Sequence, residues 1–281
     1  MNYKKLNNLT GWLVFAIATA VYLLTMEQTT SLWDCGEYIT TANKLEVGHP
    51  PGAPLWMMLG RLFSAFASPE NVAMMINSMS ALSSSFPILF LFWSITMMAR
   101  KLALKDGEIG NNSTIAILGA GAVGALAYTF TDSFWFSAVE GEVYAMSSFF
   151  TAIVFWAILK WDLEVNEYRD DSESKPTIGH PNRWLIFISY MIGLSIGVHL
   201  LNLLAIPAIG FVIYFKKYEF KWRSFFIAGI ISLVVLVTIQ DIIIPRIVSL
   251  ADSIERFFVN GMGLPFNSGA LFFLVVLLGL I

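Results

Sequence analysis

Charged side chains are scarce in this sequence. Only 13% of its 281 residues are Asp, Glu, Lys or Arg, whereas 57% are hydrophobic. Because a soluble globular domain carries about 25% charged residues, this composition excludes that class and predicts a membrane protein. Cysteine and histidine are scarce as well, with one Cys and 3 His. The single Cys35 excludes an intrachain disulfide, and so few histidines argue against a zinc site.

Two further classes of function lack a signal in the sequence. The basic residues form no stripe of the kind that binds nucleic acid, so we expect no nucleic acid partner. No arrangement of Ser, His and Asp predicts a nucleophilic triad. Any chemistry must therefore come from the polar residues that interrupt the apolar sequence.

Long apolar runs fill most of the chain. They lie at residues 11–25, 71–99, 114–130, 143–159, 184–198, 200–215, 225–244 and 270–281. A backbone in lipid must satisfy its own hydrogen bonds, so each run is predicted to be a helix. We therefore predict an all-α, polytopic membrane protein with about seven or eight transmembrane helices. Lys4 and Lys5 precede the first run as in a secretory signal, but no small-residue cleavage site follows, so we expect an uncleaved helix.

The basic residues gather on one side of the predicted membrane. With the N-terminus in the cytoplasm, 13 of the 17 Lys and Arg residues are cytoplasmic, and those outside are Lys44, Arg61, Arg246 and Arg256. This bias predicts a cytoplasmic N-terminus. The polar, acidic segment 161–183 is then a cytoplasmic loop. The last apolar run stops at Ile281 without a polar tail, so we expect residues 1–281 to be the N-terminal membrane module of a longer chain.

One glycine motif has two interpretations. Gly119, Gly121 and Gly124 form a G-x-G-x-x-G after an apolar run, as in dinucleotide-binding folds. That fold needs a parallel sheet, whereas this segment lies between predicted membrane helices. Small residues also recur at a spacing of four, at 116, 120 and 124 and at 121 and 125. This spacing predicts close packing of neighbouring helices.

The polar segment from Met26 to Glu70, named the first loop, is predicted to be external. A connection of that length in a compact protein is usually functional. If residues 32–46 form a helix, one of its faces carries Asp34, Glu37, Tyr38 and Thr41. Two carboxylates on one face have pKa values that are pushed apart, so one of them can stay ionised and act as a general base. In the alternative, Ser31 and Asp34 form a capping box and Glu37 is only solvated, and the spacing alone favours neither.

The second half of the first loop contains a turn and an apolar stretch. His49 begins an H-P-P-G turn, whose prolines fix the backbone and present His49 where it can meet a phosphate. Residues 55–67 are apolar almost throughout, which predicts a helix along the membrane interface. Arg61 in this stretch either pairs with a lipid phosphate or only extends its charge into water.

Two more polar clusters lie on the same predicted external side. Glu140 and Glu142, with Tyr144 nearby, stand where the fourth apolar run begins, and a helix start favours acids. His199 and Asn202 lie between two short runs that must meet at an external turn, where they bind substrate or satisfy broken backbone. No cluster has a metal signature, but the carboxylates of the first loop or of the Glu140 pair suit a divalent cation.

Three of these motifs resemble a known family. They are W-D-C-G-E-Y-I at 33–39, G-H-P-P-G-A-P-L at 48–55 and E-G-E-V-Y-A at 140–145. In this order and spacing they are similar to the membrane proteins of unknown-function family 2723 (DUF2723). That family is related to the eukaryotic transmembrane protein 260, a protein O-mannosyltransferase. The resemblance covers about the first two hundred residues.

The resemblance implies a glycosyltransferase of the GT-C type, a helix bundle whose long first external loop carries juxtamembrane helices. The implied donor is a sugar on a polyprenyl phosphate, and the acceptor is a hydroxyl of a protein Ser or Thr or of a glycan. By position, Asp34 is the base that deprotonates the acceptor, and Glu37 is a supporting acid. His49 and Arg61 are expected to contact the lipid phosphate. The residues expected to complete the substrate site are Tyr38, Glu140, Glu142, Tyr144, His199 and Asn202.

The expected location and partners follow from the same resemblance. A bacterial member of the family lies in the inner membrane with its active face in the periplasm, where it meets membrane lipid, the polyprenyl-phosphate carrier and the acceptor. No cofactor is assigned beyond the lipid-linked donor and a divalent cation that the acids could hold. The alternatives are a transporter or flippase of a lipid-linked intermediate, with acids on broken helices at mid-membrane, and a non-catalytic scaffold.

Overall fold

The computed structural model describes residues 2–103, 110–170 and 180–279, and this part of the chain contains helices and no strands. Six helical stretches in it are long and apolar enough to cross a membrane: Tyr3–Thr25, Pro69–Ala103, Asn111–Thr129, Val143–Val165, Leu200–Lys217 and Trp222–Gly261. Two shorter apolar helices are α8 (Arg183–Ile196) and α12 (Ser268–Gly279). The prediction of an all-α, polytopic membrane protein is confirmed.

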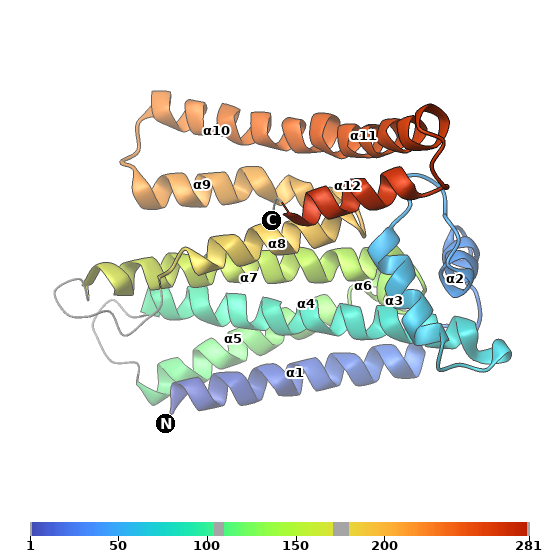
Figure 1. The fold of residues 1–281 in the computed structure, drawn as a ribbon. Coiled ribbons are helices and arrows are strands. Elements are labelled where there is room, and N and C mark those ends of the chain that lie inside the picture. Colours follow the sequence, from blue (N-terminus) through green and yellow to red (C-terminus); the bar gives the residue numbers. More distant parts are fainter. Residues whose placement is uncertain (1, 104–109, 171–179, 280–281) are drawn as a thin grey trace. The chain divides into compact units, whose positions relative to one another are not determined.

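The chain forms two compact units, Met1–Ala205 and Ile206–Ile281. In unit 1, α4 (Val72–Ala103) is central and packs against α1 (Tyr3–Thr25), α5 (Asn111–Thr129) and α7 (Val143–Asp170), while α8 packs against α7 (Figure 1). We name the end of this bundle where α1 finishes the loop end. The opposite end, where α1 starts and α4 finishes with Arg100 and Lys101, is the basic end.

Two helices of unit 1 are longer than the apolar runs that predict them. α1 starts at Tyr3 instead of residue 11, because the Asn2 side chain accepts a hydrogen bond from the Lys5 backbone N–H at 3.1 Å and caps the helix. Its 23 residues extend about 34 Å, enough to cross the hydrocarbon core. α7 continues to Asp170, into the segment expected to be a loop from residue 161, because that stretch contains no Pro or Gly. The rest of that loop, 171–179, lies outside the described residues.

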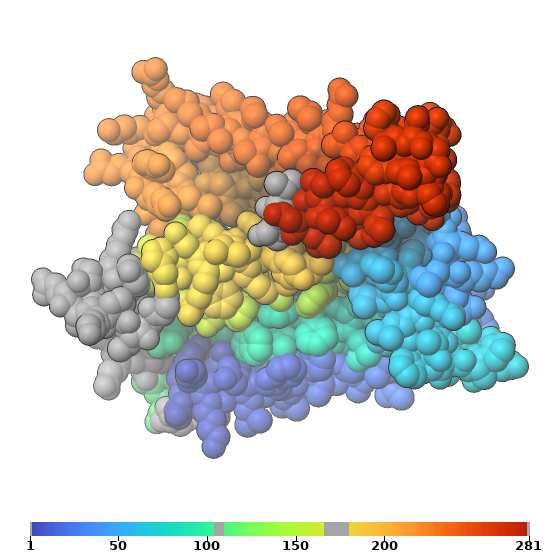
Figure 2. Space-filling view, in the orientation of Figure 1, coloured from blue at the N-terminus to red at the C-terminus, as the bar shows by residue number. Residues whose placement is uncertain are grey.

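The first loop is folded against the loop end of unit 1. It contains α2 (Cys35–Lys44), α3 (Pro54–Ser64) and the short 3-10 helix η1 (Pro69–Asn71). Figure 2 shows these residues, blue to cyan, as a solid mass at that end of the unit. They share one buried cluster with α4 and α7, whose members include Tyr38, Ile39, Trp56, Met57, Ile76, Met79, Met146 and Phe150. The loop is therefore anchored on the core of the helix bundle and presents fixed side chains.

Unit 2 contains α9 (Ala205–Lys217) from Ile206 onward, and one long helix that runs from Trp222 to Gly261. The long helix joins α10 (Trp222–Val237), the π-helical η5 (Thr238–Ile243), α11 (Ile244–Arg256) and the π-helical η6 (Phe257–Gly261). Its 40 residues extend about 60 Å, roughly twice the hydrocarbon thickness. The polar α11 half, with Asp252, Glu255 and Arg256, therefore extends beyond the hydrocarbon core.

The glycines of α5 pack helices together at Gly121 and Gly124, one from each of the two predicted rows. A Cβ built on Gly121 would lie 2.5 Å from Cγ2 of Thr96 on α4, and one on Gly124 would lie 2.8 Å from Cδ1 of Ile95. Ala125, in the same row as Gly121, is fully buried. Ala116 and Ala120, which precede Gly124 in its row, are exposed, and a Cβ built on Gly119 meets nothing within 4 Å. Helix packing, and not nucleotide binding, explains the motif.

Replacing Gly121 by Val should destabilise the bundle, because the added atoms collide with Thr96 and Phe92 of α4. Overpacking of this kind costs about 1–3 kcal/mol. Gly119→Val is the matched control, since it makes the same chemical change on the open face of the same helix. Thermal unfolding in detergent should give a melting temperature several degrees lower for Gly121→Val than for Gly119→Val. Equal melting temperatures would contradict this account of α5.

Candidate functional site

The start of α2 places Asp34 and Glu37 one helical turn apart. α2 is shorter than the predicted 32–46, and Asp34 is its N-cap residue, yet the Asp34 side chain makes no capping hydrogen bond. The Ser31 hydroxyl instead donates to Oε2 of Glu140 at 2.5 Å and to Sγ of Cys35 at 3.0 Å. The capping-box alternative is therefore wrong, and neither Ser31 nor Asp34 is used to close the helix end.

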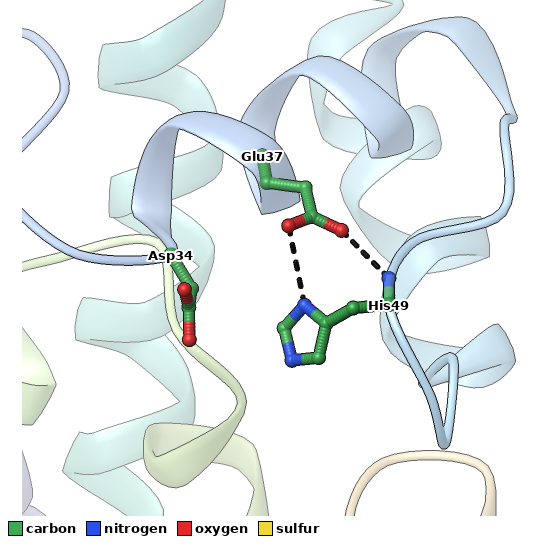
Figure 3. Close-up of side chains that lie close together, drawn as sticks. All are labelled: Asp34, Glu37 and His49. Carbon is green, nitrogen blue, oxygen red and sulfur yellow. Dashed lines mark hydrogen bonds and ion pairs between the residues drawn. The ribbon is translucent and has the colours of Figure 1, made fainter.

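Glu37 binds the H-P-P-G turn. Its Oε1 accepts a hydrogen bond from the His49 backbone N–H at 2.6 Å, and its Oε2 lies 3.2 Å from Nδ1 of the same residue (Figure 3). The backbone N–H of His49, followed by its ring, holds the pKa of Glu37 below its usual value. Both carboxylate oxygens of Glu37 are thus engaged in orienting His49, although the side chains of both residues are 41% exposed.

Asp34 has an exposed carboxylate without a described partner. It makes no side-chain hydrogen bond or ion pair within the described residues, and no dashed line reaches it in Figure 3. One ligand atom from each of Asp34, Glu37 and His49 lies within 4.8 Å of the others. This set, named the surface triad, could accept a proton at Asp34 or hold a divalent cation.

Glu140 and Glu142 lie beneath the start of α2 and are only 5% and 6% exposed. The Cys35 thiol lies 3.7 Å from Oε1 of Glu142, as Ser31 lies against Glu140. Burial, together with the negative charge of Glu140, raises the pKa of Glu142. Burial also raises the pKa of Cys35 to about 12, so this cysteine remains a thiol and has no nucleophilic role near neutral pH.

Aromatic rings connect the surface triad to the buried acids. The Tyr38 ring lies 5.5 Å from the His49 ring and 5.2 Å from the Trp56 ring, measured between centroids. The Trp56 indole N–H donates to the backbone carbonyl of Glu142 at 3.1 Å. Burial raises the pKa of Tyr38 to about 12, so its hydroxyl remains protonated. The first and second polar clusters of the sequence therefore form one region.

The third cluster joins this region through the start of α3. The Leu55 backbone N–H donates to the carbonyl of Gly197 at 2.7 Å, close to His199. The His199 ring lies 5.4 Å from the ring of Tyr144, which is 50% exposed. Nδ1 of His199 accepts from the Leu201 N–H at 3.1 Å, and burial lowers the pKa of this histidine. The His199 ring is therefore neutral near pH 7, and it accepts a hydrogen bond from the neighbouring backbone.

Asn202 and Arg61 lie apart from the surface triad. Asn202, in the 3-10 helix η4 (Leu200–Leu204), is buried, and its Oδ1 accepts hydrogen bonds from Thr151 at 2.5 Å and Ser147 at 3.3 Å, both on α7. Arg61 donates to the Asn43 backbone carbonyl at 2.7 Å, near the far end of α2. That position is about 9 Å along the helix axis from Glu37. Arg61 lines a separate cleft of about 430 Å³, so the geometry does not bring it together with His49.

Two residues that position the site were not singled out from the sequence. Asn77 of α4 donates from Nδ2 to the carbonyls of Glu27 and Thr29, at 2.8 and 2.9 Å, and so fixes the start of the first loop. A lone amide within an apolar run was a usable signal. Trp56 gave no such signal, because an indole in an amphipathic stretch is expected at any membrane interface.

The fold and these residues define a polytopic helical membrane protein with an acid-rich loop packed against one end of its first bundle. The chain belongs to the family described as protein O-mannosyl-transferase TMEM260 N-terminal domain, which matches residues 34–222. The relation to transmembrane protein 260, predicted from three motifs, is confirmed.

Two curated relatives are similar over about half of the chain. The protein O-mannosyl-transferase tmem260 of Dictyostelium discoideum is 30% identical over 147 residues, which are 51% of this chain and 16% of the relative. The protein O-mannosyl-transferase TMEM260 of Mus musculus is 27% identical over 149 residues, 53% of this chain and 19% of the relative. The aligned part of this chain thus spans less than a fifth of either relative. No solved structure matches the chain.

Glu37→Ala should loosen the H-P-P-G turn, because it removes both acceptors that hold His49. Hydrogen exchange of a peptide covering residues 46–53 should show a faster-exchanging His49 amide than in the wild type. Glu46→Ala is the control, since it removes a nearby exposed acid that does not bind the turn. Unchanged exchange in Glu37→Ala would contradict the anchoring role.

The same contact should depend on pH in a defined direction. The pKa of Glu37 is lowered in the folded protein, so its stabilisation of the turn is complete above the ordinary value of 4.5. The stabilisation is lost as the pH falls through the lowered pKa. The protection factor of the His49 amide, corrected for intrinsic exchange, should therefore be constant above about pH 5 and fall in stronger acid. In Glu37→Ala the protection factor should not change with pH over this range.

Proposed function

We propose that this protein is a GT-C type glycosyltransferase that moves a sugar from a polyprenyl-phosphate donor to a hydroxyl acceptor, such as a protein Ser or Thr. The observation that carries the proposal is the free Asp34 carboxylate beside the Glu37–His49 pair, at the start of the family match. The names of the two relatives support the transferase class. The proposed donor and acceptor are those that the family resemblance implies.

Asp34 is the proposed general base. Glu37 has both oxygens bound to His49, and Glu142 is buried with a raised pKa, whereas Asp34 is exposed and unpaired within the described residues. The acceptor oxygen attacks the anomeric carbon of the sugar and gives its proton to Asp34. The bond from that carbon to the phosphate oxygen breaks, and the polyprenyl phosphate leaves with the electron pair. A single displacement of this kind inverts the anomeric centre and needs only one base.

His49 is the proposed contact for the leaving phosphate. Its Nδ1 faces Glu37, which fixes the ring so that Nε2 points away from that carboxylate (Figure 3). A donor group fixed before the reaction stabilises the charge that develops on the phosphate without a reorganisation cost. Arg61 stays a prediction as a phosphate contact, in the cleft at the far end of α2.

Exposed apolar side chains next to the surface triad support the proposed binding of a prenyl carrier. Leu32 is 80%, Trp33 87% and Val47 91% exposed, although each is next to polar loop residues. Trp33 also has a φ of 65°, a left-handed conformation that is strained for a residue with a Cβ. An isoprenoid chain at the membrane surface would cover these side chains and place its phosphate near His49. The same side chains also suit contact with acyl chains of the surrounding lipid.

The orientation is part of the proposal. The loop end faces the outside, which in a bacterium is the periplasm, because the sequence predicts 13 of the 17 Lys and Arg residues on the cytoplasmic side. A transporter or flippase would instead need acids on broken helices at mid-membrane. Asp34 and Glu37 precede α4 and the buried pair precedes α7, outside the candidate spans. Asp241, in the π-helical η5, lies about 20 residues into the 40-residue candidate span Trp222–Gly261 and is the acid that a transporter would use.

Asp34→Asn should reduce transfer by about 100-fold or more, because an amide cannot accept the proton. The assay uses the full-length protein in membranes, polyprenyl-phosphate mannose labelled in the sugar, and a Ser/Thr-rich peptide. The matched control is Asp132→Asn, which removes another exposed acid at the start of α6 (Asp132–Ala138). Wild-type activity in Asp34→Asn would remove Asp34 from the mechanism. Absence of transfer by the wild-type protein would reject the donor or acceptor proposed above.

Chelation of metal ions tests whether Asp34 acts as a general base or the surface triad binds a cation. We propose transfer without a bound metal, because the two carboxylate oxygens of Glu37 already accept hydrogen bonds from His49. Activity should therefore persist in excess EDTA. A loss that Mg²⁺ or Mn²⁺ restores would assign Asp34, Glu37 and His49 to cation binding instead. In that case Glu37→Gln should weaken the response to metal more than Glu46→Gln does.

A further inference from the structure

A second cavity lies at the basic end of unit 1, away from the surface triad. It has a volume of about 780 Å³ and is formed by the start of α1 and the last turns of α4 and α7. This size is in the range of pockets that bind small ligands. α1 runs the length of the bundle between this cavity and the first loop, so about 34 Å of helix separates the two regions (Figure 1).

The charged side chains that line this cavity are mainly cationic. They are Lys4, Arg100, Lys101, Lys160 and Glu164. Lys101 is paired with Asp162 at 2.7 Å, and Glu164 with Arg183 at 2.9 Å, so these two charges are neutralised locally. The other three cations have no ion pair within the described residues. The cavity thus concentrates uncompensated positive charge in one place.

Two of these cations are held in position by aromatic rings. The Arg100 guanidinium lies 4.9 Å from the centroid of the Tyr3 ring, and the Lys160 ammonium lies 5.6 Å from that of Trp156. A cation over a ring face is attracted to it but keeps its charge and its N–H donors. Asn2, Asn7 and Asn8 add amide N–H donors to the lining, whereas the buried Oδ1 of Asn7, which has no hydrogen-bond partner, is an acceptor and offers no contact to an anion. The wall is therefore rich in donors whose positions are already restricted.

We propose that this cavity binds a phosphate group. A phosphate offers several acceptor oxygens and a charge that matches the free cations, and arginine can contact two of its oxygens at once. The aromatic wall of Tyr3, Trp93 and Trp156 suits the carbon atoms attached to a phosphoester. An anionic phospholipid headgroup and a soluble phosphate share this chemistry. This site is independent of the transferase proposal, because none of its residues belongs to the surface triad.

The test measures ligand retention by the purified full-length protein. Native mass spectrometry from mixed micelles compares dioleoyl phosphatidylglycerol with dioleoyl phosphatidylcholine, and a thermal shift assay tests about 10 mM inorganic phosphate. Arg100→Gln combined with Lys160→Gln should reduce retention of the anionic lipid about tenfold, by the loss of charge-assisted hydrogen bonds. Lys5→Gln combined with Lys217→Gln is the control. It removes the same charge from residues that do not line the cavity. This control variant should retain as much anionic lipid as the wild type.

The outcomes distinguish a phosphate that belongs to a lipid headgroup from a soluble phosphate. Selective retention of phosphatidylglycerol that the double variant loses supports a lipid headgroup. A thermal shift with inorganic phosphate that the double variant loses supports a soluble phosphate. If the cavity variant and the control retain both lipids equally and neither responds to phosphate, the proposal is overturned. Lys160→Arg keeps the charge, so this variant should retain the anionic lipid as the wild type does. That result would show that the loss of retention in the double variant does not come from misfolding. Transfer activity at the loop end should not change in any of these variants.

Discussion

The loop end depends on one buried hydrogen bond. The indole of Trp56 is fully buried and donates to the backbone carbonyl of Glu142, so α3 of the first loop is joined to the residue that precedes α7. An indole buried without a partner for its N–H is costly, which gives this docking a single favoured geometry. Tyr38 packs on the same ring and then on His49. The position of the H-P-P-G turn is thereby fixed relative to the helices that cross the membrane.

The carboxylates of the site lie in two layers with different chemistry. The outer layer is exposed: Glu37 is bound to His49, and Asp34 is free to accept a proton or a cation. The inner layer, Glu140 and Glu142, is buried beneath Ser31 and Cys35, where desolvation favours the protonated form of Glu142. The open surface of the outer layer leaves room for the proposed lipid-linked donor and hydroxyl acceptor.

The two ends of unit 1 carry opposite charge for related physical reasons. Two acids of the loop end, Glu140 and Glu142, are buried under the first loop, which supplies a hydroxyl and a thiol donor to them. Cations gather at the basic end, where rings of α1 and α7 hold Arg100 and Lys160 without neutralising them. This separation of charge is the basis of the proposed orientation and of the different ligand proposed for each end. Close packing through Gly121 maintains the helices between them.

The sequence by itself determined the membrane class, the helices and the residues of the surface triad. Hydrophobic runs must become helices in lipid, and a spacing of three between Asp34 and Glu37 places them on one helical face wherever the helix lies. Only the tertiary structure decided that Glu37 is bound to His49, that Asn202 faces α7, and that Arg61 lies at the far end of α2. It also decided that Ser31 and Cys35 cover the buried acids. These contacts join residues that are between 12 and 109 positions apart, and local periodicity carries no information about which distant side chain fills a given space.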